Sequence, residues 1–73
     1  MAYITKYKIK HSQSICDYLF LDGETVYISD DIYKMDGQFD YSHEVYDSDR
    51  VYLGLISHDK FHRIECGLEE IYS

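Results

Sequence analysis

The chain has 73 residues, 45% of them hydrophobic and 16% aromatic, and a formal net charge of −7. This length accommodates one domain with a thin core, so we expect residues 1–73 to form a single domain. The aromatic content excludes a disordered chain, and nothing approaches the roughly 20 apolar residues of a membrane-spanning helix. From residue 11 onward, four basic residues oppose all fourteen acids, a net charge of −10. Such a body opposes phosphate binding, which argues against direct contact with nucleic acid.

The two cysteines, Cys16 and Cys66, are too few for a disulfide framework. The N-terminal residues lack an apolar run of signal-peptide length. We therefore expect reduced thiols and a cytoplasmic location.

The first third of the chain has the period-two alternation of strands. Residues 3–10 place Tyr7 and Ile9 on one face and a row of three lysines, Lys6, Lys8 and Lys10, on the other. We expect these lysines to face acids such as Asp40 and Glu44 across strands, or to protect a sheet edge. Asp22-Gly23 separates apolar residues 15–21 from residues 24–29, which predicts a type I′ hairpin between these two runs.

The middle of the chain repeats this device. Residues 32–35 lead into Asp36-Gly37, and residues 38–46 alternate cleanly, with His43 and Val45 on one face. Residues 51–56 are apolar on both faces, which predicts a central strand, and Gly54 marks a bend or bulge in it.

The C-terminal residues are compatible with two structures. We favour a strand that ends near Cys66, followed by a helical turn over residues 68–71. The alternative is a helix, because Phe61, Ile64, Leu68 and Ile71 fall at spacings that make one apolar stripe. Gly67 in its interior would cost about 1 kcal/mol, which disfavours a continuous helix.

Together these elements predict an all-β fold of five to seven short antiparallel strands, with a short C-terminal helical turn. Such a sheet forms a small, partly open barrel or a strongly bent meander. Residues 23–72 resemble an SH3-type small barrel in layout, with residues 23–29 as the opening strand. The resemblance is one of layout and includes no family motif, and such barrels host many unrelated functions.

Few residues point to metal binding or catalysis. His58, His62 and Cys66 are spaced at intervals of four, and Cys16 would complete a tetrahedral zinc site. The chain has no closely spaced ligand pair, and on a strand His62 and Cys66 would lie about 13 Å apart. We expect Cys66 in the core and the histidines at the surface. The acids do not follow a calcium-loop spacing, and no nucleophile or phosphate-loop motif is present. The sequence thus predicts a non-enzymatic protein without a cofactor or a metal.

The highest-ranked candidate site is the acidic and tyrosine-rich segment 29–49. Its predicted partner-binding residues are acids and tyrosines, namely Asp30, Asp31, Tyr33, Asp36, Asp40, Tyr41, Glu44, Tyr46, Asp47 and Asp49. Carboxylates held on a sheet are pre-organised to meet a basic surface. The competing interpretation is an acidic face that only maintains solubility.

These observations predict a protein-interaction module, a small acidic regulator or inhibitor similar in character to small phage-encoded proteins. Its partner would be a protein with a basic surface, for example one that itself binds nucleic acid. The first alternative is a structural or assembly protein that forms a homo-oligomer through exposed tyrosines. The second is a zinc-binding module.

Overall fold

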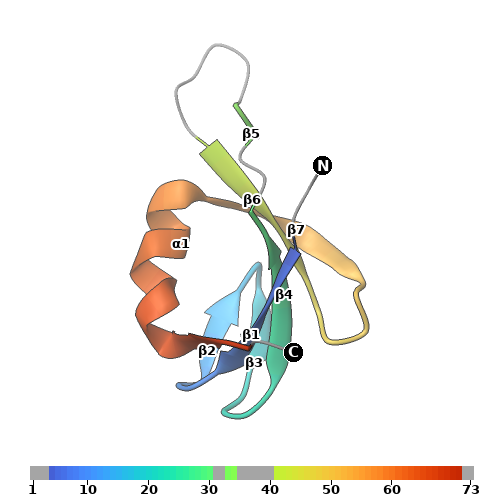
Figure 1. The fold of residues 1–73 in the computed structure, drawn as a ribbon, viewed down its shortest axis with the longest axis vertical. Helices are drawn as coiled ribbons and strands as arrows, with labels where there is room; N and C mark the ends of the chain where they lie inside the picture. The colour runs from blue at the N-terminus through green and yellow to red at the C-terminus, as the bar shows by residue number, and fades with distance from the viewer. Residues whose placement is uncertain (1–3, 31–32, 35–40, 72–73) are drawn as a thin grey trace.

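The computed structural model describes residues 4–30, 33–34 and 41–71, with side chains from all of these except residues 33, 34 and 41. Short strands dominate, and one helix lies near the C-terminus (Figure 1). In chain order the elements are β1 (Ile4–Ile9), β2 (Gln13–Ile15), β3 (Tyr18–Phe20), β4 (Thr25–Ser29), β5 (Tyr33–Lys34), β6 (Tyr41–Tyr46), β7 (Tyr52–Ser57), helix α1 (His58–Ile64), the 3-10 turn η1 (Glu65–Gly67) and β8 (Leu68–Glu70).

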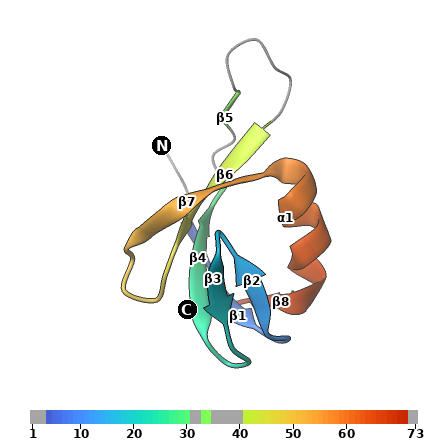
Figure 2. The same ribbon diagram turned by 180° about the vertical axis from the view of Figure 1, so that it is seen from behind.

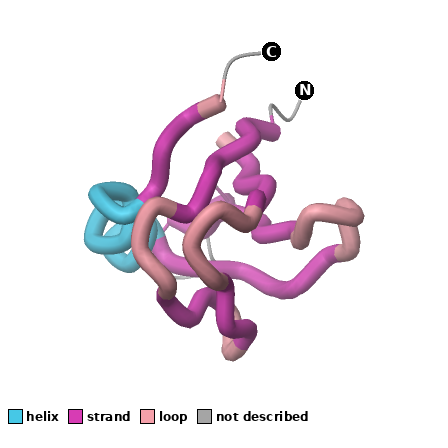
Figure 3. Tube along the Cα trace, turned by 90° about the horizontal axis from the view of Figure 1, so that it is seen from below, coloured by secondary structure: helices cyan, strands magenta, loops and turns pink. Residues whose placement is uncertain are grey.

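The main sheet is antiparallel in each of its pairings. Its order is β8-β1-β4-β6-β7, and β5 pairs with β6 beyond the end of β4. Among the described strands, β7 pairs with β6 alone and β8 with β1 alone, so the sheet curls without closing (Figure 3). The expected all-β, partly open arrangement is therefore confirmed. No helix in the described ranges is long and apolar enough to cross a membrane.

The main sheet starts earlier in the chain than predicted. We expected residues 23–29 to open the barrel, but β1 already lies inside the sheet, between β4 and β8. The separate hairpin of β2 and β3 forms the excursion between β1 and β4 (Figure 2). The strands of the main sheet thus lie between residues 4 and 70.

The core lies on the concave side of the sheet. Its buried side chains come from seven strands: Ile9, Ile15, Phe20, Val26, Ile28, Val45, Ile56 and Leu68. Within β4 the alternate residues Val26 and Ile28 are buried, and Ile9 and Val45 lie on the core faces of β1 and β6. Each fully buried aliphatic side chain contributes about 1.5–3 kcal/mol, so these few residues account for much of the stability of so small a domain.

The predicted hairpin at Asp22-Gly23 is wrong in its pairing. The two-residue turn with positive φ at both positions is Cys16-Asp17, at 52° and 65°, and it joins β2 to β3. Asp22-Gly23 is a different turn, in which the Glu24 N–H donates to the Leu21 carbonyl at 3.1 Å and Gly23 has φ 89°. That glycine position is typical of a type II turn, which redirects the chain without pairing the strands on either side.

The second predicted hairpin is partly observable. Tyr33 pairs with Ser42 in antiparallel register, as a hairpin between these runs requires. The expected turn at Asp36-Gly37 lies outside the described residues. On β6, His43 and Val45 are buried on the core face, as the alternation predicted.

The favoured order of strand and helix at the C-terminus is reversed in the structure. Helix α1 comes first, because Ser57 caps it: the Ser57 hydroxyl oxygen accepts from the Lys60 N–H at 3.1 Å. Phe61 and Ile64 pack against the core, as the helical alternative predicted. The chain then tightens into η1, whose last residue is Gly67, and so avoids a glycine in the helix interior. The last segment becomes β8 because its backbone finds hydrogen-bonding partners on β1.

Strand β7 is not central, because among the described strands only β6 pairs with it. The expected irregularity at Gly54 is present. Gly54 has φ 153°, and the register shifts between Val45 and Tyr46 on the partner strand, which marks a β-bulge. A bulge bends the strand and changes the direction in which the preceding side chains project.

Candidate protein-binding surface

The outer face of the β6–β7 hairpin combines apolar and acidic side chains. Val51, Tyr52 and Leu55 are 56%, 52% and 46% exposed. In the strand register Glu44 lies opposite Leu55, and Tyr46 lies opposite Tyr52. We call these five residues the hairpin surface. Large apolar side chains gathered on one exposed face and flanked by charge are typical of protein-binding sites.

Two tyrosines form the centre of the hairpin surface. The rings of Tyr46 and Tyr52 meet edge to face, with centroids 5.7 Å apart. Desolvation raises the pKa of the Tyr46 phenol, and the charge of Glu44 and a hydrogen bond to it raise this pKa further. The phenol is therefore neutral at physiological pH and donates to the carboxylate. This contact fixes both side chains before any partner arrives, which lowers the entropic cost of binding.

The turn that joins β6 to β7 is organised by Asp47. Its Oδ1 accepts from the backbone N–H groups of Asp49 and Val51, at 2.8 and 2.9 Å. The Arg50 N–H donates to the Asp47 carbonyl at 2.9 Å, and Arg50 has φ 64°. A tight turn followed by a left-handed residue is a common hairpin connection. Asp47 thus holds the turn together, while Asp49 is exposed at its tip.

Arg50 extends the hairpin surface toward β4. Its guanidinium carbon lies 4.9 Å from the centroid of the Tyr27 ring, a cation–π distance. Tyr27 is the register neighbour of Tyr46 on one side and of Lys6 on the other. The outer face thus has a row of aromatic rings across three adjacent strands, with a cation at the Tyr27 end.

A shallow hollow of about 540 Å³ adjoins this row. Its lining mixes apolar, acidic and basic side chains: Ile4, Thr5, Lys6, Tyr27, Arg50, Glu70 and Ile71. The hollow lies on the outer face of β1 and β4, away from the core. Its wide mouth and mixed lining fit the rim of a protein interface better than a small-molecule pocket.

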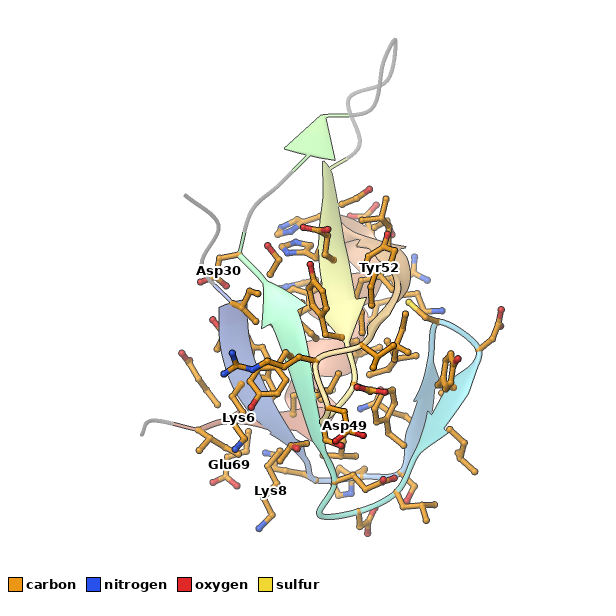
Figure 4. The ribbon with its side chains drawn as sticks, turned by 90° about the vertical axis from the view of Figure 1, so that its right-hand side faces the viewer. Lys6, Lys8, Asp30, Asp49, Tyr52 and Glu69 are labelled. Carbon is orange, nitrogen blue, oxygen red and sulfur yellow. The ribbon has the colours of Figure 1, made fainter. Side chains whose placement is uncertain are left out.

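The structure divides the predicted partner-binding residues into three groups. Glu44 and Tyr46 lie on the hairpin surface, Asp49 is at the tip of the adjacent turn, and Asp47 is inside that turn. Asp30 follows the opposite end of β4, where Thr5 Oγ1 donates to its carboxylate at 3.1 Å (Figure 4). The side chains of the others lie outside the described residues: Asp31, Tyr33, Asp36, Asp40 and Tyr41.

The lysine row lies beside other strands than the ones that we named as its neighbours. Strand β1 is not an edge, and Lys8 lies opposite Glu69 of β8, while Lys6 lies opposite Tyr27 with its ammonium 5.9 Å from the ring centroid (Figure 4). Glu44, which we expected to face these lysines, pairs with β7 instead. Lys8 thus lies next to an acid of β8, and the row forms one side of the outer face.

The four residues of the zinc alternative do not come together in the described structure. His62 forms an ion pair with Glu65 at 2.9 Å, and His58 hydrogen bonds to His43. Cys66 is exposed, so its predicted place in the core is wrong. Among the described residues no group of three or more His, Cys, Asp or Glu side chains is arranged to hold a metal ion.

Cys16 lies at the tip of the β2–β3 hairpin, against β7. A Cβ atom on Gly54 would lie 3.4 Å from its sulfur, so the two residues approach closely. Burial raises the pKa of the Cys16 thiol, which keeps it protonated and a poor nucleophile. Its role in this geometry is packing.

Sequence reasoning missed Val51, Tyr52 and Leu55. Their signal was present, since residues 51–56 are apolar on both faces, but we interpreted it as burial on both faces. Comparison with protein-family models, curated proteins and solved structures finds no match. The functional proposal therefore depends on the geometry of the described residues.

Proposed function

We propose that this protein is a non-enzymatic interaction module, a small acidic regulator or inhibitor that docks on a basic protein surface through the β6–β7 hairpin. The observation that carries the proposal is the exposure of Tyr52 and Leu55 on β7 and of Val51 immediately before it. A small domain gains stability by burying such side chains, and a partner that covers them accounts for their exposure together on one hairpin.

The charge of the chain supports a basic partner. The net charge is −7, and among the described residues the hairpin surface contains the acid Glu44 and the adjoining turn exposes Asp49. Apolar centres with charged rims are typical of protein interfaces, in which tyrosine often dominates the binding energy. The rim charges would speed association and select the partner, while Tyr52 and Leu55 would provide most of the affinity. Two unpaired thiols are compatible with a cytoplasmic partner.

The test is capture of the partner with matched variants. Tyr52→Ser and Leu55→Ser remove the apolar centre, and Leu19→Ser is the control, because Leu19 is 68% exposed on the separate β2–β3 hairpin. Immobilised wild-type chain is incubated with lysate of the organism that encodes it, and retained proteins are identified by mass spectrometry. We expect one specific protein that the control retains and both hairpin variants lose.

Variants of the two acids beside the apolar centre, Glu44 and Asp49, measured at several salt concentrations, then test the contribution of charge. Glu44→Gln and Asp49→Asn should slow association and reduce its dependence on ionic strength, because screening acts on exposed charges. Circular dichroism of each variant verifies the fold. Equal capture by the wild-type chain and the Tyr52→Ser and Leu55→Ser variants would refute the proposal.

A second candidate function is supported by another observation. Strand β3 and the turn after it expose Tyr18, Leu19 and Leu21, at 55%, 68% and 54%. This second apolar surface favours self-association into a homo-oligomer. Light scattering across a concentration series at high salt decides between the two: an assembly larger than 8.7 kDa that Leu19→Ser dissociates supports oligomerisation, and a monomer at all concentrations eliminates it.

A further inference from the structure

Two histidines from different elements meet where helix α1 packs on the sheet. His43 on β6 is only 4% exposed, and its Nε2 lies 3.0 Å from Nδ1 of His58, the first residue of α1. The ring centroids are 5.3 Å apart with an interplanar angle of 24°. This separation equals the N···N distance plus the two ring radii, so the nitrogens point at one another nearly in plane. The contact is an imidazole–imidazole hydrogen bond and not a stack.

The surroundings fix the buried ring. Nδ1 of His43 lies 2.8 Å from the carbonyl oxygen of Ser29, and Phe61 of α1 covers the His43 ring face at a centroid distance of 4.7 Å. A carbonyl oxygen only accepts, so Nδ1 of His43 carries a hydrogen in every protonation state. Nε2 of neutral His43 is therefore an acceptor, and Nδ1 of His58 must be the donor.

Proton counting then distinguishes three states of the pair. With no added proton, the Nδ1–H of His58 donates to His43. The first proton binds Nε2 of the exposed His58 ring, and the hydrogen bond becomes charge-assisted and shorter. A second proton would have to bind Nε2 of His43. Two N–H groups would then face each other at 3.0 Å and a second positive charge would be buried, so the bond must break.

We propose that His43 and His58 form a one-proton latch, which holds helix α1 against β6 in its neutral and singly protonated states and releases the helix when both rings are protonated. The latch joins β6, which carries part of the hairpin surface, to the helix that follows β7. Acid would therefore loosen the helix that follows the proposed binding strand.

The charged groups around the latch do not alter this count. Among the side chains that the structure describes, those carried by the surrounding elements are Lys6 and Lys8 on β1, Asp30 after β4, Glu44 on β6, and Asp59, Lys60, His62, Arg63 and Glu65 on α1 and η1. Strand β7 carries none. Tyr7 of β1 packs edge to face on Phe61, and burial, with Asp30 and Glu70 nearby, raises the pKa of its phenol, so Tyr7 stays neutral. Carboxylates favour uptake of the first proton, but the 3.0 Å between the two ring nitrogens still holds only one hydrogen.

The first test reads the hydrogen positions of the wild-type chain directly. Two-bond nitrogen–proton correlation spectra distinguish the tautomers of each histidine. At pH 7.5 we expect the Nδ1–H form for both His43 and His58, although free histidine prefers Nε2–H. At lower pH His58 should become cationic while His43 keeps its neutral Nδ1–H form. An Nε2–H tautomer at His58 at pH 7.5 would overturn the proposal.

The second test measures stability between pH 7.5 and 4.5 by urea unfolding. Free histidines protonate near pH 6.5, so below this pH the unfolded chain binds one proton more than the latched native state. As the pH falls, the unfolding constant of the wild type should therefore increase about tenfold per pH unit relative to that of His58→Ala. In this variant water replaces the missing ring. His11→Ala, an exposed histidine variant in the β1–β2 loop, is the matched control and should behave as the wild type.

Two further readouts distinguish release of the helix from global unfolding and from metal binding. In acid, nuclear Overhauser contacts between Phe61 and His43 should disappear at a higher pH than contacts between Val45 and Ile56. A pH slope in His58→Ala equal to that of the wild type refutes the latch. Stabilisation of the wild type by zinc ions that is lost in His58→Ala would show that the pair holds a metal ion, which also overturns the proposal.

Discussion

The bulge at Gly54 offers a direct test of how the hairpin surface is built. Gly54 has φ 153°, a conformation that side-chain-bearing residues rarely adopt, and an added Cβ would meet the Cys16 sulfur at 3.4 Å. Backbone strain of this kind costs about 1–3 kcal/mol. The sulfur lies at the short limit of van der Waals contact, and Cys16 is packed against β7 and cannot easily move away, so the contact adds to that cost. We expect Gly54→Ala to destabilise the chain by about 2–4 kcal/mol.

Two control variants separate the sources of this loss. Gly23 has φ 89° with nothing within 4 Å of an added Cβ, so Gly23→Ala reports backbone strain alone, about 1 kcal/mol. Cys16→Ala in the Gly54→Ala background removes the sulfur contact and should recover only the steric part. Urea unfolding measures each difference, and with a slope near 1 kcal/mol per molar for so small a chain, Gly54→Ala should shift the midpoint by about 2 M or more. A loss no larger than that of Gly23→Ala would refute this role of the bulge.

Two other predictions follow from the turns. Asp47→Ala removes the acceptor of two backbone N–H groups and should lower the free energy of unfolding in urea by about 1–2 kcal/mol. Asp49→Ala at the exposed tip should leave this free energy nearly unchanged. Equal losses in the two variants would contradict the assignment of Asp47 to the turn. Asp22 accepts from the Ser12 hydroxyl at 2.8 Å, and this bond and a second one from the Ser12 N–H lower the pKa of its carboxyl below 3.8. The stability that these bonds contribute is present above the pKa of Asp22 in the unfolded chain. It is lost as the pH falls through the lower pKa of Asp22 in the folded chain. The unfolding free energy of Asp22→Asn should therefore vary less with pH below about pH 4 than that of the wild type, and an unchanged acid profile would contradict this role.

The sequence determined which residues face the core in the regular strands. Alternation in β1 and β6 placed Ile9, His43 and Val45 on the buried face, because side chains on a strand project to opposite sides with period two. The all-β class and the open sheet also follow from short alternating runs separated by turns. These properties depend on neighbours in the chain, so local pattern is sufficient.

Strand partners were decided only by the tertiary structure. Asp22-Gly23 correctly marks a reversal, but a turn signal does not state which strands pair, and β4 pairs with β1 and β6 instead of β3. At the C-terminus, Phe61 and Ile64 satisfy both a helical stripe and a strand pattern. The capping hydroxyl of Ser57 binds the Lys60 N–H three residues away and favours the helix locally. The strand that follows depends on β1, which is distant in sequence and offers its free edge to residues 68–70.

The same physical reason applies to the candidate site. The acids and Tyr46 of the β6–β7 region are recognisable from composition, but their roles differ: Asp47 holds a turn, whereas Glu44 lies beside an exposed leucine. Tyr52 and Leu55 appear in the sequence as ordinary core residues of a central strand. Whether an apolar side chain is buried depends on which elements cover its face, and here no described element covers Tyr52 and Leu55 on the outer face of β7. The sequence determines the alternation and the turns, and the tertiary structure determines which apolar residues are available to a partner.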